Sequence, residues 1–211
     1  MKTRSALTRV LTVLAGGLAT AGLLAPPASA ADTSLSLACQ ATPPIGSAQN
    51  FTLHAAVTAT APQTVAAGSQ FSVTLAPDPL TVPTSVSGYT LQSISNIQLT
   101  VPVPANTTLV DESVSGGTDP GSASVTVNGG NVVVKLSSSI AGGSTLTLPA
   151  LTLDLTAGTS GSTVQTALGG TDYSNPGLTF TATVPIAFFT VDVPTACFPS
   201  PQAVLSSTSV S

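Results

Sequence analysis

The chain has 211 residues, and only 6% of them are charged, whereas about 25% is usual for a globular domain. Four basic side chains stand against eight acidic ones, so the clustered Lys and Arg that neutralise phosphates are missing. The composition therefore excludes nucleic acid as a partner and disfavours anionic membrane surfaces. A surface built from Ser, Thr, Gly, Asn and Gln suits an extracellular wall or matrix, although secreted β-proteins without a binding role share it.

Residues 1–30 are predicted to form a cleavable signal peptide. Three basic residues precede an apolar run over 10–24, and the small residues Ala28-Ser29-Ala30 follow two prolines, which is the order of a secretory signal. The run has about fifteen residues, fewer than the roughly twenty that a membrane-spanning helix needs. We expect cleavage between Ala30 and Ala31, although a retained N-terminal anchor is the alternative. The mature chain would be extracellular, without a membrane span, and would keep Lys135 as its one basic side chain.

Two cysteines, Cys39 and Cys197, lie near the two ends of the predicted mature domain. In an oxidising compartment with no third thiol to compete, they are expected to form one disulfide. The bond would join the first strand to the last and would stabilise the fold by up to about 5 kcal/mol. Two distant Cys and a single His do not make a tetrahedral zinc site.

The mature chain shows the alternation of apolar and polar residues that is typical of β-strands, interrupted by Gly, Pro and Asn. A proline-rich stretch at 76–83 predicts an edge or a crossing between sheets. Ile94 is out of phase with the strand that follows, which predicts a bulge near Ser95-Asn96. The turn Asn128-Gly129-Gly130-Asn131 predicts a hairpin. The predicted strands cover residues 35–39, 51–57, 71–75, 97–103, 125–127, 132–136, 146–155, 178–184 and 189–193.

These elements predict an all-β fold, an antiparallel β-sandwich over residues 31–198. The remaining segment, 199–211, contains Ser and Pro with little apolar pattern. We expect this tail to be flexible.

Three segments resemble a known class of module: Val65–Gly68, Asn96–Val110 and Gly142–Leu148. They are similar to the immunoglobulin-like repeat modules of bacterial surface proteins, in which a strand, a Pro-containing bend and a Gly-Gly-Ser-Thr turn recur. The mature chain also resembles small secreted proteins of high-GC Gram-positive bacteria that have one Cys near each end. The resemblance implies an immunoglobulin-like sandwich at the cell surface and brings no catalytic residues.

No catalytic residue is assigned. His54 is the single His, and strand alternation places it on the outer face. Asp111 and Glu112 are adjacent, so in a strand they face opposite sides and cannot act together as a local acid and base. The sequence therefore does not predict an enzyme.

Three residues are candidate ligand or partner contacts. Asp119 and Asp172 lie in turn-like segments, where Asp usually binds its own backbone. Calcium is the alternative for such loops, and no cofactor is predicted. Tyr173 could offer a ring to a sugar or pack on its own hairpin. In the pair Phe188-Phe189, strand alternation sends one ring to each face, so that one ring is exposed and offers an apolar contact; the alternative is a sheet that is covered on both sides.

We expect a secreted, non-catalytic structural or adhesion module of the cell envelope. Its partner would be an envelope or wall component, or a second copy, because few charges protect the sheet edges. The alternative is an extracellular binding protein for a small apolar or carbohydrate ligand, held between the sheets or at a loop end. A hydrolase that uses Asp111, Glu112, Asp119 or His54 is the third hypothesis.

Overall fold

The computed structural model describes residues 28–211, which form an all-β fold with a single short 3₁₀ helix, η1 (Pro120–Ser122). Most of the predicted signal peptide, 1–27, lies outside the described residues. Its last three residues begin strand β1 and pair with Thr60, Ala61 and Pro62, and cleavage after Ala30 stays a prediction. Within 28–211, no helix has the length and hydrophobicity to cross a membrane.

One continuous sheet makes up most of the fold, with the strand order β10-β11-β8-β16-β17-β1-β2-β4-β14-β9 and with β12 beside β8. Its strands are β1 (Ala28–Ala41), β2 (Gln49–Pro62), β4 (Gln70–Pro77), β8 (Ser93–Pro102), β9 (Thr107–Ser115), β10 (Ala123–Asn128), β11 (Asn131–Leu136), β12 (Ile140–Ala141), β14 (Ala150–Ala157), β16 (Leu178–Ile186) and β17 (Phe189–Pro199).

Three small sheets complete the fold. β5 (Leu80–Thr81) pairs with β13 (Thr145–Leu146), and β6 (Ser85–Val86) pairs with β7 (Tyr89–Thr90). The third sheet joins β15 (Thr163–Ala167), β18 (Val204–Val210) and β3 (Thr64–Val65).

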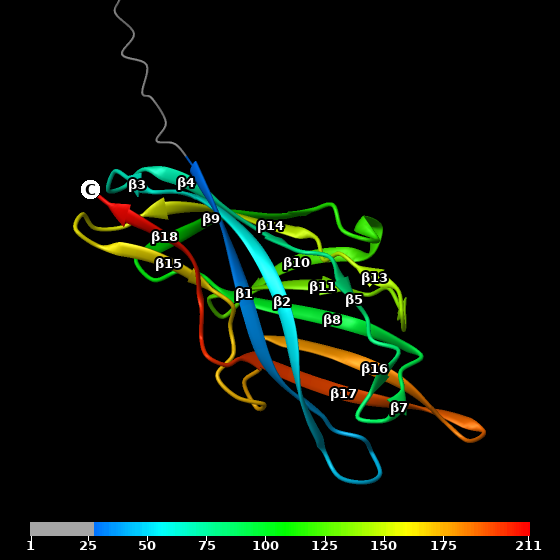
Figure 1. The fold of residues 1–211 in the computed structure, drawn as a ribbon. Helices are drawn as coiled ribbons and strands as arrows, with labels where there is room; N and C mark the ends of the chain where they lie inside the picture. Colours follow the sequence, from blue (N-terminus) through cyan, green and yellow to red (C-terminus); the bar gives the residue numbers. More distant parts are fainter. Residues whose placement is uncertain (1–27) are drawn as a thin grey trace, which may run out of the picture.

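The main sheet curls so that its apolar face is enclosed. The long strands β1 and β2 cross in front of β8, β16 and β17 (Figure 1), and the two edge strands, β9 and β10, contact each other. Alternate residues of β14 are inside, with Leu151, Leu153 and Leu155 at most 2% exposed. The predicted antiparallel, sandwich-like class is confirmed, whereas the finer immunoglobulin-like assignment stays a prediction.

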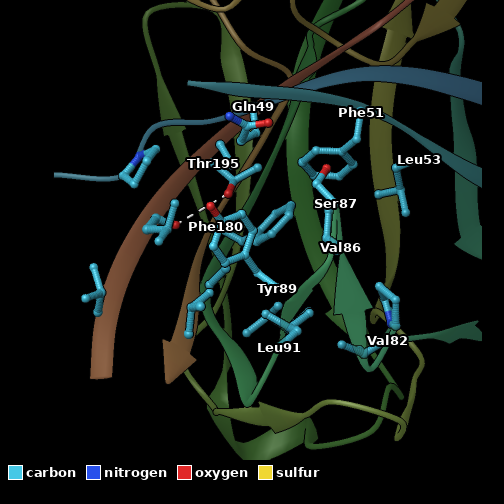
Figure 2. A pocket seen from close by; sticks show the side chains of 18 of the residues that line it. Gln49, Phe51, Leu53, Val82, Val86, Ser87, Tyr89, Leu91, Phe180 and Thr195 are labelled. Carbon is cyan, nitrogen blue, oxygen red and sulfur yellow. Dashed lines mark hydrogen bonds between the residues drawn. The ribbon is translucent and has the colours of Figure 1, made fainter. Parts of the chain in front are cut away.

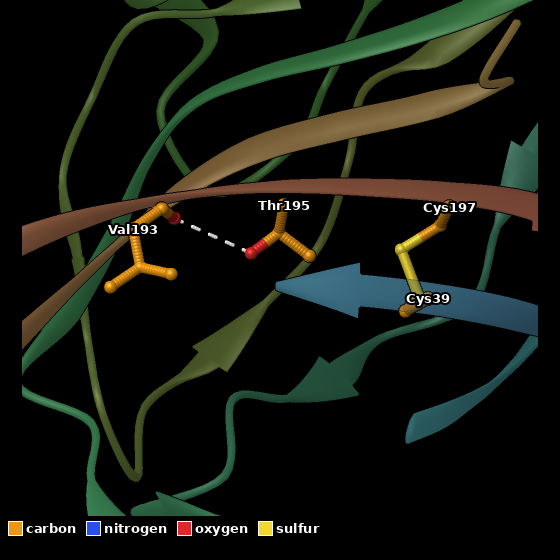
Figure 3. Close-up of a disulfide and its surroundings, with 4 residues drawn as sticks. All are labelled: Cys39, Val193, Thr195 and Cys197. Atoms are coloured by element: carbon orange, nitrogen blue, oxygen red, sulfur yellow. Dashed lines mark hydrogen bonds between the residues drawn. A yellow bond between two sulfur atoms is a disulfide. The ribbon is translucent and has the colours of Figure 1, made fainter. Parts of the chain in front are cut away.

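The predicted disulfide between Cys39 and Cys197 is confirmed. The two residues lie directly opposite each other in β1 and β17 and are fully buried (Figure 3). The bond does not join the first strand to the last, because β18 follows β17.

The tail is where the structure corrects the prediction. Residues 204–210 form β18, which pairs antiparallel with β15 and parallel with β3. Leu205, Thr208 and Val210 are buried, and the Thr208 hydroxyl donates a hydrogen bond to the Pro62 carbonyl at 2.7 Å. Polar residues occupy most of this strand, so the two inward aliphatic side chains are too sparse to show as a pattern. The sheet β15-β18-β3 closes one end of the core, which we call the capped end.

Two local predictions are confirmed. β10 and β11 form the hairpin around Gly129 and Gly130. The register between β8 and β16 shifts where the bulge was expected, and Asn96 has a positive φ of 51°.

Candidate functional site

An apolar cavity of about 370 Å³ lies between the curled main sheet and the small sheets β5–β13 and β6–β7. It is at the turn end of the β1–β2 hairpin, whereas Pro62, at the other end of this hairpin, receives Thr208 of the capped end. Figure 2 shows Phe51, Val82, Leu91 and Phe180 around the space. The buried part of the lining comprises Val82, Leu91, Ile94, Ile97, Leu146, Leu178, Ala182, Val193 and Thr195.

Three turns surround the opening of the cavity, and we call them the three tips: residues 42–48, 85–90 and 186–189. Ile45, Tyr89 and Phe189 each line the cavity, and they are 85%, 57% and 58% exposed. Because the same side chains face both cavity and solvent, the cavity opens between the tips.

Local backbone geometry explains why apolar side chains protrude at two of the tips. Ser87 and Gly88 both have positive φ, as the two-residue turn of the β6–β7 hairpin requires. Ile186 pairs with Phe189, so Ala187 and Phe188 form the two-residue turn of the β16–β17 hairpin. Phe188 therefore points away from both strands and is fully exposed.

Among the described residues, 28–211, no charged side chain lines the cavity. Ser47, Gln49 and Ser87 supply polar atoms near the opening, whereas Thr195 is the one buried polar side chain in the lining. The Thr195 hydroxyl donates to the Val193 carbonyl at 3.4 Å. The interior of the site therefore suits an uncharged, apolar group.

A second cavity, of about 70 Å³, extends the apolar space toward the capped end. Its lining includes Leu168, Leu205 of β18 and one acidic residue, Asp78. The two cavities share part of their lining: Leu53, Leu80, Leu146, Leu148 and Leu178. The two cavities are therefore neighbours in the core.

An empty cavity with the volume of the larger of the two would lower the stability of the fold considerably. At about 24 cal/mol per Å³, an enclosed empty cavity of that size would cost on the order of 9 kcal/mol, which is comparable with the whole stability of an ordinary domain. Because this cavity opens to solvent, that figure is an upper bound. A ligand that fills the space with apolar contacts recovers part of this free energy.

The three candidate contact residues lie outside this cavity. The Asp172 carboxylate accepts hydrogen bonds from the backbone N–H of Ser174 at 2.8 Å and of Asn175 at 2.9 Å. Together with the Ser174 hydroxyl, which contributes most, these bonds hold the pKa of Asp172 below its usual value. Asp172 thus forms hydrogen bonds within its own loop, as Asp residues in turns usually do.

Tyr173 packs edge-on against Phe198 of β17, with ring centroids 5.1 Å apart. Asp119 is exposed, and its backbone carbonyl accepts from the N–H and hydroxyl of Ser122 at 3.1 and 2.9 Å. Both residues therefore have local structural contacts.

The residues considered for hydrolysis lie apart. His54 is exposed on β2, and β4 and β14 separate this strand from β9, a separation of about 14 Å. On β9, Asp111 is opposite Asp154 and Glu112 is opposite the buried Leu153. Asp111 and Glu112 therefore face opposite sides, as predicted.

In the part of the chain that the structure describes, no three His, Cys, Asp or Glu side chains gather in a group that could hold a metal ion. Calcium stays the alternative that was considered for Asp119 and Asp172.

The sequence predicted an exposed apolar side chain in the Phe188-Phe189 pair, but we did not predict the exposed side chains of Ile45 and Tyr89. Both residues of the pair are exposed, instead of one. A signal for the others does exist: Ile45 stands between Pro44 and Gly46, and Tyr89 follows Gly88. A large apolar residue inside a turn, such as Ile45, or directly after one, such as Tyr89, lies at the margin of a sheet, where few neighbours cover it.

Comparison with known proteins adds little to this geometry. No known protein family matches the sequence, and no curated protein is significantly similar to it. One solved structure is similar, that of a "Putative membrane anchored protein" from Corynebacterium diphtheriae, with a TM-score of 0.48 and 17% sequence identity. The match covers 86% of this chain and 38% of that one, so the chain spans less than half of that protein.

Proposed function

We propose that the protein is an extracellular, non-catalytic binding protein that holds an apolar ligand between its sheets. One observation carries the proposal: the cavity of about 370 Å³ is open and almost wholly apolar, and none of the residues 28–211 that line it is charged. Its volume falls within the roughly 300–1,000 Å³ of small-molecule pockets.

The shape and lining of the site indicate the class of ligand. An aliphatic chain suits a space that continues past Leu53 and Leu178 toward a second apolar cavity. An uncharged polar end would stay near the opening, where Ser47, Gln49 and Ser87 supply hydrogen-bonding atoms. A ligand with a buried charge is disfavoured, because the lining has no side chain of opposite charge to pair with it.

Two observations support the extracellular and non-catalytic parts of the proposal. The Cys39–Cys197 disulfide is typical of proteins in an oxidising compartment. The ionisable candidates Asp111, Glu112, Asp119 and His54 all lie outside the lining of the cavity. The structural or adhesion role expected from sequence stays a prediction, and it would not require an open apolar cavity.

Binding of an uncharged solvatochromic dye, Nile red, to the oxidised protein tests the proposal. We expect saturable fluorescence enhancement, displacement of the dye by long-chain alcohols, and a rise in melting temperature when these alcohols are bound.

Ala182→Leu is the diagnostic variant, because Ala182 is a buried part of the lining and a larger side chain would occupy the ligand's space. We expect its dye affinity to fall about tenfold or more, which is 1.4 kcal/mol or more. Ala123→Leu, on β10 and outside the lining, is the matched control and should bind normally. Equal affinity of the two variants, or no saturable binding, would refute the proposal.

A further inference from the structure

Exposed apolar side chains are concentrated at the three tips. In the described part of the chain, eight large hydrophobic residues are exposed, and five of them belong to the tips. These five are Ile45, Tyr89, Ile186, Phe188 and Phe189. Phe188 does not even line the cavity, so ligand binding inside the cavity does not account for its exposure.

The tips carry no charge. None of the segments 42–48, 85–90 and 186–189 contains Asp, Glu, Lys, Arg or His. The nearest charge on the β16–β17 hairpin is Asp192, which is exposed and accepts a hydrogen bond from the Thr183 hydroxyl at 2.9 Å. Asp192 lies three residues beyond Phe189, about 10 Å along an extended strand. An apolar medium could therefore cover the tip itself without desolvating a charge.

We infer that the three tips dock on an uncharged lipid surface and that the ligand passes between this surface and the cavity. The inference rests on the proposed function and names the source of its ligand. Aromatic and aliphatic side chains at the tips would enter the interface, where Tyr is favoured because its ring is apolar and its hydroxyl polar. An apolar molecule could then move from lipid to cavity through the opening without crossing water.

Shape and charge favour lipid over a second copy of the chain. The β1–β2 loop and the β16–β17 turn project as separate points in Figure 1, whereas a stable protein interface needs about 800 Å² of complementary surface per partner. Without Lys or Arg at the tips, anionic head groups would gain no attraction, so the surface should be zwitterionic or neutral.

The chain has no Trp, which allows a specific optical test. Phe188→Trp places a single reporter at a tip, and Val127→Trp is the matched control, at a 47% exposed position on β10. Val127 lies near the end of β8 at Pro102, whereas the cavity is lined by Ile94 and Ile97 from the beginning of β8.

We expect vesicles of phosphatidylcholine to shift the emission of Phe188→Trp to shorter wavelength, with quenching by lipids brominated on their acyl chains. Emission of Val127→Trp should not change. Replacement of part of the phosphatidylcholine by an anionic phospholipid should weaken the response, because Asp192 and the net acidic chain are repelled.

The variant Phe188→Ser separates docking from ligand binding, because Phe188 lies at a tip and does not line the cavity. Its affinity for vesicles should fall about tenfold or more, equivalent to 1.4 kcal/mol or more, while the affinity for Nile red in solution is kept. Full vesicle binding by this variant, or no spectral shift of Phe188→Trp, would overturn the inference and leave the proposed function standing. A spectral shift that depends on protein concentration without vesicles, with dimers in light scattering, would identify a second copy as the occupant and equally overturn it.

Discussion

Apolar side chains are buried at the capped end and exposed at the end with the three tips. At the capped end, Leu205 and Val210 of β18 are buried, and the backbone N–H of Ser211 donates to the Val65 carbonyl at 2.8 Å. At the other end, Ile45 and Phe188 are exposed around an open cavity. The same β1–β2 hairpin runs from one end to the other.

This difference indicates a division of roles. Burial of apolar surface stabilises the fold by about 25 cal/mol per Å². The apolar side chains of the capped end contribute this stabilisation because they are buried, whereas the exposed side chains of the tips do not. Side chains that remain exposed at a cost in stability are candidates for binding. We therefore expect substitutions at the capped end to change stability, and substitutions at the tips or in the cavity to change binding.

Removal of the disulfide should have the largest effect, because the bond holds together strands that serve both ends. Cys39→Ala combined with Cys197→Ala should lower the free energy of unfolding by about 2–5 kcal/mol, as measured by urea denaturation. Thr195, two residues from Cys197 on β17, lines the cavity (Figure 3), so Nile red affinity should fall as well. Unchanged stability would mean that the remaining packing already restrains β1 and β17.

A pair of truncations compares the two ends directly. Leu205→Ala should cost about 2–4 kcal/mol, because Leu205 is buried and its truncation removes packing contacts from the core. Phe188→Ala should change the free energy of unfolding by less than about 0.5 kcal/mol, because its side chain is fully exposed. Similar losses in urea denaturation would contradict the division between a structural end and a binding end.

Enlargement of a buried alanine measures where the core is loosely packed. Ala59 is 1% exposed in β2 and lies outside both cavities, so Ala59→Leu should cost about 1–3 kcal/mol through overpacking. Ala182→Leu extends into the cavity, so its melting temperature should stay within a few degrees of that of the native chain. A large loss of stability in Ala182→Leu would show that the cavity is not available space.

The smallest effect concerns Asp172, which belongs to neither end. Its pKa in the folded protein is lowered from the ordinary 3.8 by hydrogen bonds from Ser174, Asn175 and Thr171. The stabilisation is therefore present above pH 3.8 and is lost as the pH falls through the lowered pKa. Asp172→Asn should melt slightly below the native chain at neutral pH, and the difference should shrink below pH 3.8. A constant difference across a pH series would show that ionisation of Asp172 is not involved.

Patterns local to a few residues were predicted correctly from sequence. The alternation of apolar residues, the Asn128-Gly129-Gly130-Asn131 turn and the out-of-phase Ile94 report backbone geometry over a short span, so strands, hairpin and bulge follow from them. Asp111 and Glu112 face opposite sides for the same reason, since adjacent residues of a strand alternate. The disulfide could be predicted because Cys39 and Cys197 have no competitor.

The capped end and the cavity depend on which segments meet. β18 is mostly Ser, Thr and Val, and it is fixed as a strand by pairing with β15 and β3, which are distant in the chain. The cavity exists because the β1–β2 loop, the β6–β7 hairpin and the β16–β17 turn converge around one opening.

The sequence by itself thus determined that the chain is an all-β domain with a disulfide and few charges. Only the tertiary structure decided that one end is closed and the other open, because packing between distant segments sets which apolar side chains are covered and which line a space.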